Sequence, residues 1–262
     1  MTELIAPNHT RRKLGDGQTV LGTMVAEIRQ PTMMQALANA GFDFAIIDNE
    51  HGPFNIESIA ELCRAARHVG VTPIVRVPDL LYPFLCQPLD AGAQGLMLPR
   101  ITSAAQVHQA VQMTKYPPMG ARGCALNRGH TDFGPRPLVD FMAAANVETQ
   151  LIIQIETASA VDQVEDIVAI PGVEVAFIGP NDLSISLGVP GQSDSPVLLG
   201  AIERVIAACQ RHNVTPAIQV ADAAAGAYWK DKGMQMISVN SEMGLLIGAG
   251  RSVTSALRDE RG

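Results

Sequence analysis

The chain has 262 residues, of which 47% are hydrophobic and 17% charged, and its formal net charge is -7. This length and composition predict a globular protein with a sizeable hydrophobic core. No run of basic residues is longer than Arg11-Arg12-Lys13, which argues against nucleic-acid binding, because a phosphate footprint needs a basic face. The apolar stretches are too short for a membrane span, and no signal-peptide core begins the chain, so no membrane association is expected.

Eight apolar runs of strand length recur along the chain, and a helical pattern follows each of them. The strands are predicted near residues 20-25, 44-48, 72-76, 95-98, 150-155, 174-178, 214-218 and 235-239. The helices are predicted at 32-40, 56-68, 81-91, 103-114, 158-170, 196-212, 221-232 and 241-258. Several strands are continuously apolar, as parallel strands covered on both faces are. Eight such units predict one (β/α)8 TIM barrel over residues 1-262, with an open doubly wound sheet as the alternative.

One segment interrupts this alternation, and it lies between the fourth helix and the fifth strand. Residues 115-149 are rich in Gly, Arg and Pro and contain Gly120-Ala121-Arg122-Gly123 and Arg128. Long loops inside compact domains are commonly functional. We therefore expect a long loop excursion here that could lie over the catalytic rim.

The cysteines are scattered, with no CxxC pair, which argues against a disulfide framework and against a zinc site. They are Cys63, Cys86, Cys124 and Cys209. Buried thiols in a reducing compartment are the simplest interpretation, so a cytoplasmic location is expected.

Polar side chains follow the second to the sixth predicted strands, where a barrel carries its catalytic groups. Buried charges are costly unless they are paired or bind a metal, so folding alone hardly explains this clustering. The residues are Asp48, Glu50, His51, Arg76, Arg100, Gln154, Glu156, Asn181 and Asp182.

Two of these acids, Glu156 and Asp182, end apolar runs and have no Lys or Arg close by in the sequence. Two carboxylates at one rim would suit Mg²⁺ or Mn²⁺, which prefer oxygen ligands and leave positions for substrate. Solvated acids at strand ends are the alternative. The chain has four lysines and none follows a predicted strand, so carbonyl chemistry through a Schiff base is not expected.

Three further residues have side chains suited to proton transfer or to charge stabilisation. His51 is the one histidine that follows a strand beside carboxylates, which favours a general acid/base over a structural cap. Arg76 could hold a developing oxyanion or form a structural salt bridge. Asp90 lies at a helix C-terminus, where the helix dipole disfavours a carboxylate; we expect a specific partner, with His51 the candidate, or else a solvated acid.

The chain resembles the HpcH/HpaI aldolase family nearly from end to end. The resemblance rests on several motifs that occur in this order and spacing. They are Asp48-Asn49-Glu50-His51-Gly52-Pro53, Pro73-Ile74-Val75-Arg76, Asp90-Ala91-Gly92-Ala93, Tyr116-Pro117-Pro118 with Gly120-Ala121-Arg122-Gly123, Gln154-Ile155-Glu156-Thr157 and Phe177-Ile178-Gly179-Pro180-Asn181-Asp182-Leu183-Ser184.

The resemblance implies a barrel of the phosphoenolpyruvate/pyruvate superfamily and a divalent metal, Mg²⁺, Mn²⁺ or Co²⁺. It implies that metal binding belongs to Glu156 and Asp182, enolate stabilisation to Arg76, and acid/base chemistry to His51 with Asp90. Asp48 joins this catalytic set. The resemblance further implies that Gln154 and the backbone amides of the Asn181-Asp182 turn bind the 2-oxo acid.

The implied reaction is reversible class II aldol chemistry, in which a 4-hydroxy-2-oxo acid gives pyruvate and an aldehyde through a metal-bound pyruvate enolate. A CoA-ester lyase and a non-catalytic 2-oxo-acid-binding protein are the alternatives. Hexamers built from dimers with exchanged C-terminal helices, here residues 241-258, are also implied. One departure is Gly22-Thr23-Met24, where the resemblance implies an aromatic residue, so a different acceptor pocket is expected.

Overall fold

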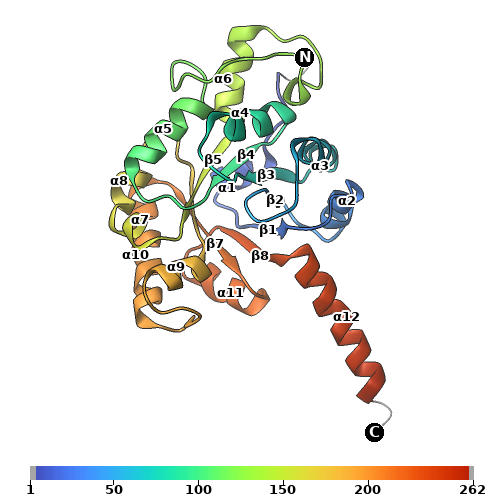
Figure 1. Cartoon of the computed structure of the whole chain (residues 1–262), viewed down its shortest axis with the longest axis vertical. Helices are drawn as coiled ribbons and strands as arrows, with labels where there is room; N and C mark the ends of the chain where they lie inside the picture. Colours follow the sequence, from blue (N-terminus) through green and yellow to red (C-terminus); the bar gives the residue numbers. More distant parts are fainter. Residues whose placement is uncertain (1–3, 260–262) are drawn as a thin grey trace.

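Eight parallel strands form a closed barrel in the computed structural model of the protein, which describes residues 4-259. Each strand pairs with its neighbours in chain order, and β1 pairs with β8 (Figure 1). This closure confirms the (β/α)8 prediction and rules out the open sheet. The strands are β1 (Val20–Val25), β2 (Phe44–Asp48), β3 (Thr72–Arg76), β4 (Gly95–Leu98), β5 (Gln150–Ile155), β6 (Val175–Ile178), β7 (Thr215–Val220) and β8 (Met236–Ser241).

The helices that follow the strands cover the outside of the barrel, and most begin and end within two residues of the predicted positions. They are α2 (Thr32–Asn39), α3 (Ile56–His68), α4 (Tyr82–Ala91), α5 (Ala104–Thr114), α7 (Ala158–Asp162), α8 (Val164–Val168), α10 (Pro196–His212), α11 (Ala223–Asp231) and α12 (Glu242–Asp259). The helix predicted at 158-170 is two short helices, α7 and α8. Three further α-helices in the described residues were not predicted from the sequence, namely α1 (His9–Gly15), α6 (Leu138–Glu148) and α9 (Pro180–Ser186).

The strands are apolar on both faces because each face packs against a different layer. Ile46 points into the barrel, where it packs with the other inward side chains. Its neighbours Ala45 and Ile47 point outward into the larger cluster between the strands and the helices. Buried side chains on both faces explain why the sequence shows continuous apolar runs rather than alternation.

The strand register stacks the inward side chains in layers, each formed by alternate strands, as is usual for this barrel. One layer is apolar except for a single hydroxyl and consists of Ile46, Met97, Phe177 and Ser238. The layer above it, toward the C-terminal ends of the strands, consists of Met24, Arg76, Gln154 and Gln219. The barrel is therefore filled by side chains below, and it becomes polar at its mouth.

The expected loop excursion at 115-149 is not a loop throughout, and it does not cover the catalytic rim of its own chain. It contains α6 and packs at the C-terminal end of α4, where Arg122 donates to the Asp90 carboxylate at 2.5 Å. His130 Nδ1 also contacts the carbonyl of Asp90 at 2.9 Å. Because the excursion follows a helix rather than a strand, it lies at the N-terminal face of the barrel.

The last helix, α12, is packed differently from the others. It contacts β1 and β8, and Figure 1 shows that its remaining length projects away from the barrel. Leu246, Val253 and Leu257 on this helix are each at least 60% exposed. Among residues 4-259, no helix is long and apolar enough to cross a membrane.

Candidate active site

A buried ion pair links the ends of β2 and β3. Asp48 and Arg76 are register partners on these strands, and they are only 3% and 8% exposed. Arg76 donates from Nε to Oδ1 of Asp48 at 2.9 Å and from its Nη2 to Oδ2 at 2.7 Å. This bidentate contact fixes the plane of the guanidinium. Burial opposes both charges, but the hydrogen bonds and attraction within the pair lower the pKa of Asp48 and raise the pKa of Arg76.

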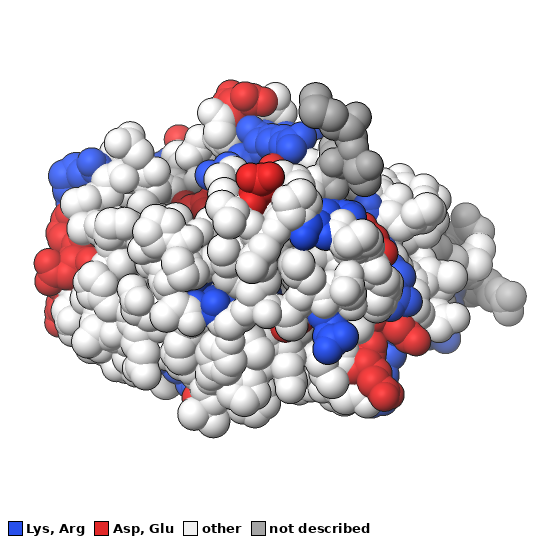
Figure 2. All heavy atoms as spheres, turned by 90° about the horizontal axis from the view of Figure 1, so that it is seen from above, with Lys and Arg blue, Asp and Glu red and all other residues white. Residues whose placement is uncertain are grey.

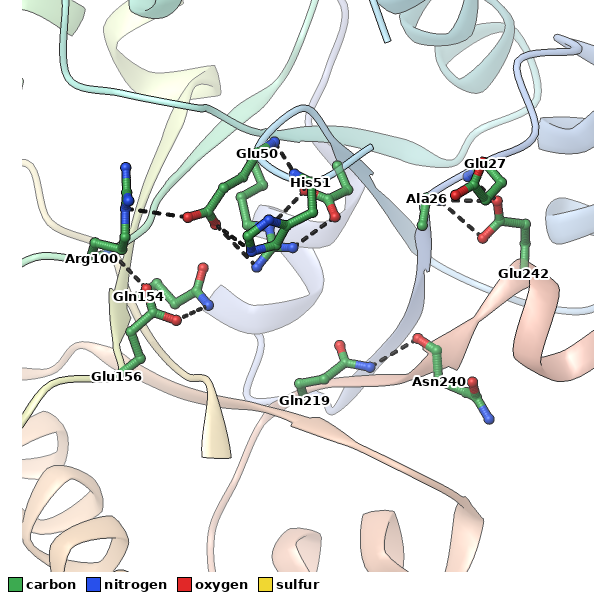
Figure 3. Close-up of polar contacts among 12 residues, drawn as sticks. Ala26, Glu27, Glu50, His51, Arg100, Gln154, Glu156, Gln219, Asn240 and Glu242 are labelled. Carbon is green, nitrogen blue, oxygen red and sulfur yellow. Dashed lines mark hydrogen bonds and ion pairs between the residues drawn. The ribbon is translucent and has the colours of Figure 1, made fainter. Parts of the chain in front are cut away.

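Asp48 also orders the turn that follows β2. Its Oδ1 accepts from the backbone amides of Glu50 at 3.1 Å and His51 at 3.3 Å. The Glu50 carboxylate lies between two arginines, 3.3 Å from Arg76 Nη1 and 3.4 Å from Arg100 Nε (Figure 3). His51 Nε2 lies 3.9 Å from Glu50, and its side chain is 71% exposed. The turn therefore presents one accessible imidazole at the mouth, above a fixed charge network.

A second carboxylate, Glu156, follows β5 and is 3% exposed. Its Oε2 accepts from Gln154 Nε2, and its Oε1 accepts from the Arg100 backbone amide at 2.6 Å. Burial raises the pKa of Glu156 to about 7, and the negative charges of Glu50 and Asp182 act in the same direction. The hydrogen bond from the Arg100 amide and the positive charge of Arg76 oppose this shift. No basic side chain forms an ion pair with Glu156 among residues 4-259.

Gly179, at the end of β6, allows the chain to approach this carboxylate. A Cβ atom there would lie 2.9 Å from Oε2 of Glu156 and 2.9 Å from Nε2 of Gln154, so a larger residue would displace both groups. Asn181 and Asp182 follow in the first turn of α9 and are exposed. The first amides of a helix have no acceptor within the helix, so those of Asn181 and Asp182 are free to bind an anion.

The donor set fits a hard divalent cation. Glu156 is a buried carboxylate whose ionised form is disfavoured by burial and by two nearby acids, and a cation would reverse both effects. Within residues 4-259, no group of three or more His, Cys, Asp or Glu side chains is arranged to hold a metal. Mg²⁺ commonly takes only one or two protein carboxylates and completes its shell with water and substrate, which matches the Glu156–Asp182 pair.

Asp90 does not pair with His51 within one chain, contrary to the expectation. It lies at the end of α4, which runs antiparallel to the strands, so it reaches the N-terminal face rather than the rim. Its carboxylate there accepts from Arg122. Within one chain Asp90 has a specific partner, as expected, but that partner is Arg122, because sequence distance does not tell which end of the barrel a residue occupies. The acid/base role of Asp90 with His51 stays a prediction.

Three features of the mouth were not predicted from the sequence. The Arg100 backbone amide binds Glu156, and Arg100 has a positive φ of 54°, which no sequence signal marks. Gln219 and Ser238, from β7 and β8, also face the interior near the mouth. Their inward positions follow from strand alternation and could have been found by counting in twos along each strand.

Charges of both signs are interspersed on the surface drawn in Figure 2, and wide areas between them are uncharged. This face carries no continuous basic field of the kind that a nucleic-acid backbone requires. A surface cavity of about 850 Å³ lies at the opposite end of the barrel, against residues such as Arg11, Gln150 and Glu174. Because it is remote from the strand ends that carry Arg76 and Glu156, we do not place the chemistry there.

Comparison with known proteins agrees with this geometry. A family model described as HpcH/HpaI aldolase/citrate lyase matches residues 23–249. The 5-keto-4-deoxy-D-glucarate aldolase of Klebsiella pneumoniae is 31% identical over 259 residues, which cover 99% of this chain and 98% of that protein. The hydroxypyruvate/pyruvate aldolase of Paraburkholderia phytofirmans is 35% identical over 230 residues, with 86% and 88% covered.

The barrel also superposes on solved structures. The HpcH/HpaI aldolase from Desulfitobacterium hafniense has a TM-score of 0.90 with this chain and 32% sequence identity, over 95% of this chain and 96% of that one. Such agreement over nearly the whole length extends the similarity from sequence motifs to the complete barrel.

Proposed function

Because the chain belongs to the HpcH/HpaI aldolase/citrate lyase family and is a carbon–carbon lyase, we propose that it is a metal-dependent class II aldolase. Its reaction is the reversible cleavage of a 4-hydroxy-2-oxo acid to a short 2-oxo acid, such as pyruvate, and an aldehyde. The observation that carries the proposal is the buried Glu156 carboxylate beside Asp182, facing a guanidinium that Asp48 holds rigid.

The names of the relatives support this class of substrate. In 5-keto-4-deoxy-D-glucarate a keto group stands next to one carboxylate, and a methylene separates it from a hydroxyl-bearing carbon. Numbered from that carboxylate, the compound is a 4-hydroxy-2-oxo acid. Hydroxypyruvate and pyruvate, in the name of the second relative, are 2-oxo acids of the size that such a cleavage releases.

Glu156 and Asp182 would hold the divalent cation, and Gln154 fixes the Glu156 carboxylate by donating to its Oε2. When bound, the cation acts as a Lewis acid that polarises the 2-oxo group and favours formation of the enolate. The free amides at the start of α9 belong to Asn181 and Asp182, so they lie next to the cation site and can bind the substrate carboxylate there. This part of the rim therefore binds and orients the 2-oxo acid.

Arg76 donates to the enolate oxygen, because its guanidinium is held in one plane before the reaction begins. Asp48 is a positioning residue: it orients Arg76 and orders the turn that carries His51. His51 takes the proton of the 4-hydroxyl group as the C3–C4 bond breaks, since it is the accessible base at the mouth. The enolate then takes a proton at C3 to give the 2-oxo acid. In the addition direction C3 loses this proton first, and His51 returns a proton to the new hydroxyl.

Enolate formation without an aldehyde tests the proposal directly. The protein with Mg²⁺, Mn²⁺ or Co²⁺ should exchange the methyl protons of pyruvate for deuterium in D₂O, followed by NMR. It should also decarboxylate oxaloacetate, because loss of CO₂ generates the same enolate. EDTA should abolish both activities, and borohydride with pyruvate should leave the enzyme active because no lysine adduct forms.

Full activity in the metal-free protein, or a reduced lysine adduct found by mass spectrometry, would refute the proposed mechanism. A protein that binds pyruvate but neither exchanges its protons nor cleaves any aldol would instead be a binding protein. Cleavage of a CoA ester with no release of pyruvate from hydroxy-oxo acids would favour the CoA-ester lyase alternative.

We also propose that the protein assembles with further copies of itself, up to the hexamer that the resemblance implies, through α12. Leu246, Val253 and Leu257 are highly exposed on this projecting helix, and burying them against a second copy would remove apolar surface from water. Light scattering should show an oligomer. The double variant Leu246→Glu with Leu257→Glu should lower the mass, whereas the control Ser252→Glu on the same helix should not.

A further inference from the structure

Three polar atoms near the mouth of the barrel are buried and have no hydrogen-bond partner among residues 4-259. They are Oε1 of Gln154, Oε1 of Gln219 and Oγ of Ser238. All three belong to inward-facing side chains of the two layers nearest the mouth, so they face the same central space. A buried polar atom without a partner costs free energy, so these three atoms are available to a ligand that satisfies them.

Gln219 is held in one orientation. Its Nε2 donates to the backbone carbonyl of Asn240 at 2.9 Å, so the amide cannot turn without losing this bond. The other end of the amide, Oε1, is left pointing toward the centre of the barrel (Figure 3). An amide oxygen only accepts hydrogen bonds, so its partner must be a donor.

The layer that contains Gln219 also contains Arg76, and the two strands that carry them, β7 and β3, lie on opposite sides of the barrel. In the proposed binding mode, the 2-oxo group lies between Arg76 and the cation site of Glu156 and Asp182, and the carboxylate lies at the start of α9. The third substituent of the oxo carbon, C3, then points to the remaining side of the mouth, where Gln219, Ser238 and Met24 lie.

We propose that Gln219 and Ser238 bind a hydroxyl group on C3, and that they make the enzyme selective for 3-hydroxy-2-oxo acids over pyruvate. This inference rests on the proposed function and assigns its specificity to two residues. The C3 hydroxyl donates to Gln219 Oε1, while Ser238 Oγ, which lies beside Gln219 in the strand register, donates to the hydroxyl oxygen. The methyl group of pyruvate cannot donate, so it leaves both protein groups unpaired.

The test compares kcat/KM for hydroxypyruvate and for pyruvate as nucleophiles with the same aldehyde in excess. The variants are Gln219→Leu, which removes the acceptor, and Ser238→Ala, which removes a hydroxyl that has no hydrogen-bond partner among the described residues. Gln35→Leu, at an exposed position on α2, is the matched control. Metal-dependent deuterium exchange of pyruvate is measured on every protein, because it reports on the enolate chemistry without any C3 hydroxyl.

The wild type should favour hydroxypyruvate. Gln219→Leu should lower the hydroxypyruvate to pyruvate ratio roughly 10- to 100-fold, the range for leaving a polar group unpaired, and should keep pyruvate exchange. Ser238→Ala should lower the ratio less, and Gln35→Leu should leave it unchanged. A wild type that exchanges pyruvate but prefers it, or variants with an unchanged ratio, would overturn this inference alone. Loss of exchange in the wild type would instead overturn the proposed function.

Discussion

The two sides of the barrel mouth are built in different ways. On the β2–β5 side, charged groups such as Asp48, Arg76 and Glu50 are paired with one another, and hydrogen bonds fix their orientation. On the β7–β8 side, Gln219 and Ser238 are neutral, and each has a polar atom without a hydrogen-bond partner in the part of the chain that the structure describes. Charge stabilisation requires groups that are oriented before substrate arrives, whereas selectivity requires groups that the substrate itself must satisfy. The charged side should therefore control turnover, and the neutral side the choice of substrate.

The largest effect is expected from His51→Ala. Removing the acid/base group should lower kcat for aldol cleavage by roughly 10²- to 10⁴-fold. Decarboxylation of oxaloacetate should be affected much less, because it requires no removal of a hydroxyl proton. His108→Ala, at an exposed position on α5, is the control. An equal loss in both reactions, or a weaker affinity for metal, would show that His51 acts in binding rather than in proton transfer.

Arg76→Lys should come next, with a loss of roughly 10²- to 10³-fold, typical of removing one donor to an oxyanion. Lysine keeps the charge but lacks the planar guanidinium that matches Asp48. Because enolate formation is common to all three reactions, cleavage, decarboxylation and deuterium exchange should fall together. Exchange at the wild-type rate in this variant would contradict the role proposed for Arg76.

Asp48→Asn tests whether the ion pair between Asp48 and Arg76 also stabilises the fold. Losing the charge-assisted contact with Arg76 should lower the free energy of unfolding by roughly 1.5 to 3 kcal/mol at pH 7, measured by urea denaturation. The pKa of Asp48 is lowered in the folded protein, so its contribution is present above the unfolded-state value, near 3.8. It is lost as pH falls through the folded value, so the two proteins should converge in acid. A difference that persists unchanged in acid would argue against this ion pair as the cause.

The smallest effect is expected from Glu242→Gln, near the neutral side. The buried Glu242 carboxylate accepts from the amides of Ala26 and Glu27 (Figure 3) and from that of Ile28, which fixes the loop after β1 to the start of α12. The amide keeps one acceptor, so we expect a loss of about 1 kcal/mol in stability and little change in kcat. Unfolding should be compared at a fixed protein concentration. A large fall in kcat would place this loop in the catalytic machinery.

Much of the fold could be predicted because the signals are local. Strand-length apolar runs and helical periodicity predicted helices at 56-68 and 196-212, the bounds that α3 and α10 have in the structure. Gly92, with φ of 108°, ends α4 in the left-handed conformation that its position after a helix predicts. The short helices α1, α6 and α9 were missed, because seven to eleven residues with weak periodicity cannot be told from a loop.

The site was predictable only in part. Residues that follow parallel strands must share one rim, which is why the sequence places Asp48, Arg76 and Glu156 at the same end of the barrel, while their roles stay predictions. Asp90 was expected beside His51, whereas within one chain it lies at the other face, because the pattern around it shows a helix end without showing at which face that end lies. Gln219 was overlooked because it lies inside a strand rather than after one.

The sequence itself determines the order of strands and helices, the side chains at the strand ends and the absence of a lysine suited to a Schiff base. Each of these depends on residues a few positions apart. Which groups meet was decided by barrel closure. Closure sets the register, and the register places Gln219 opposite Arg76 and pairs Asp48 with Arg76. The direction of α4 brings Asp90 to Arg122 at the other face. Such pairings join residues far apart in the chain, and their energies depend on burial and distance, which exist only in the folded protein.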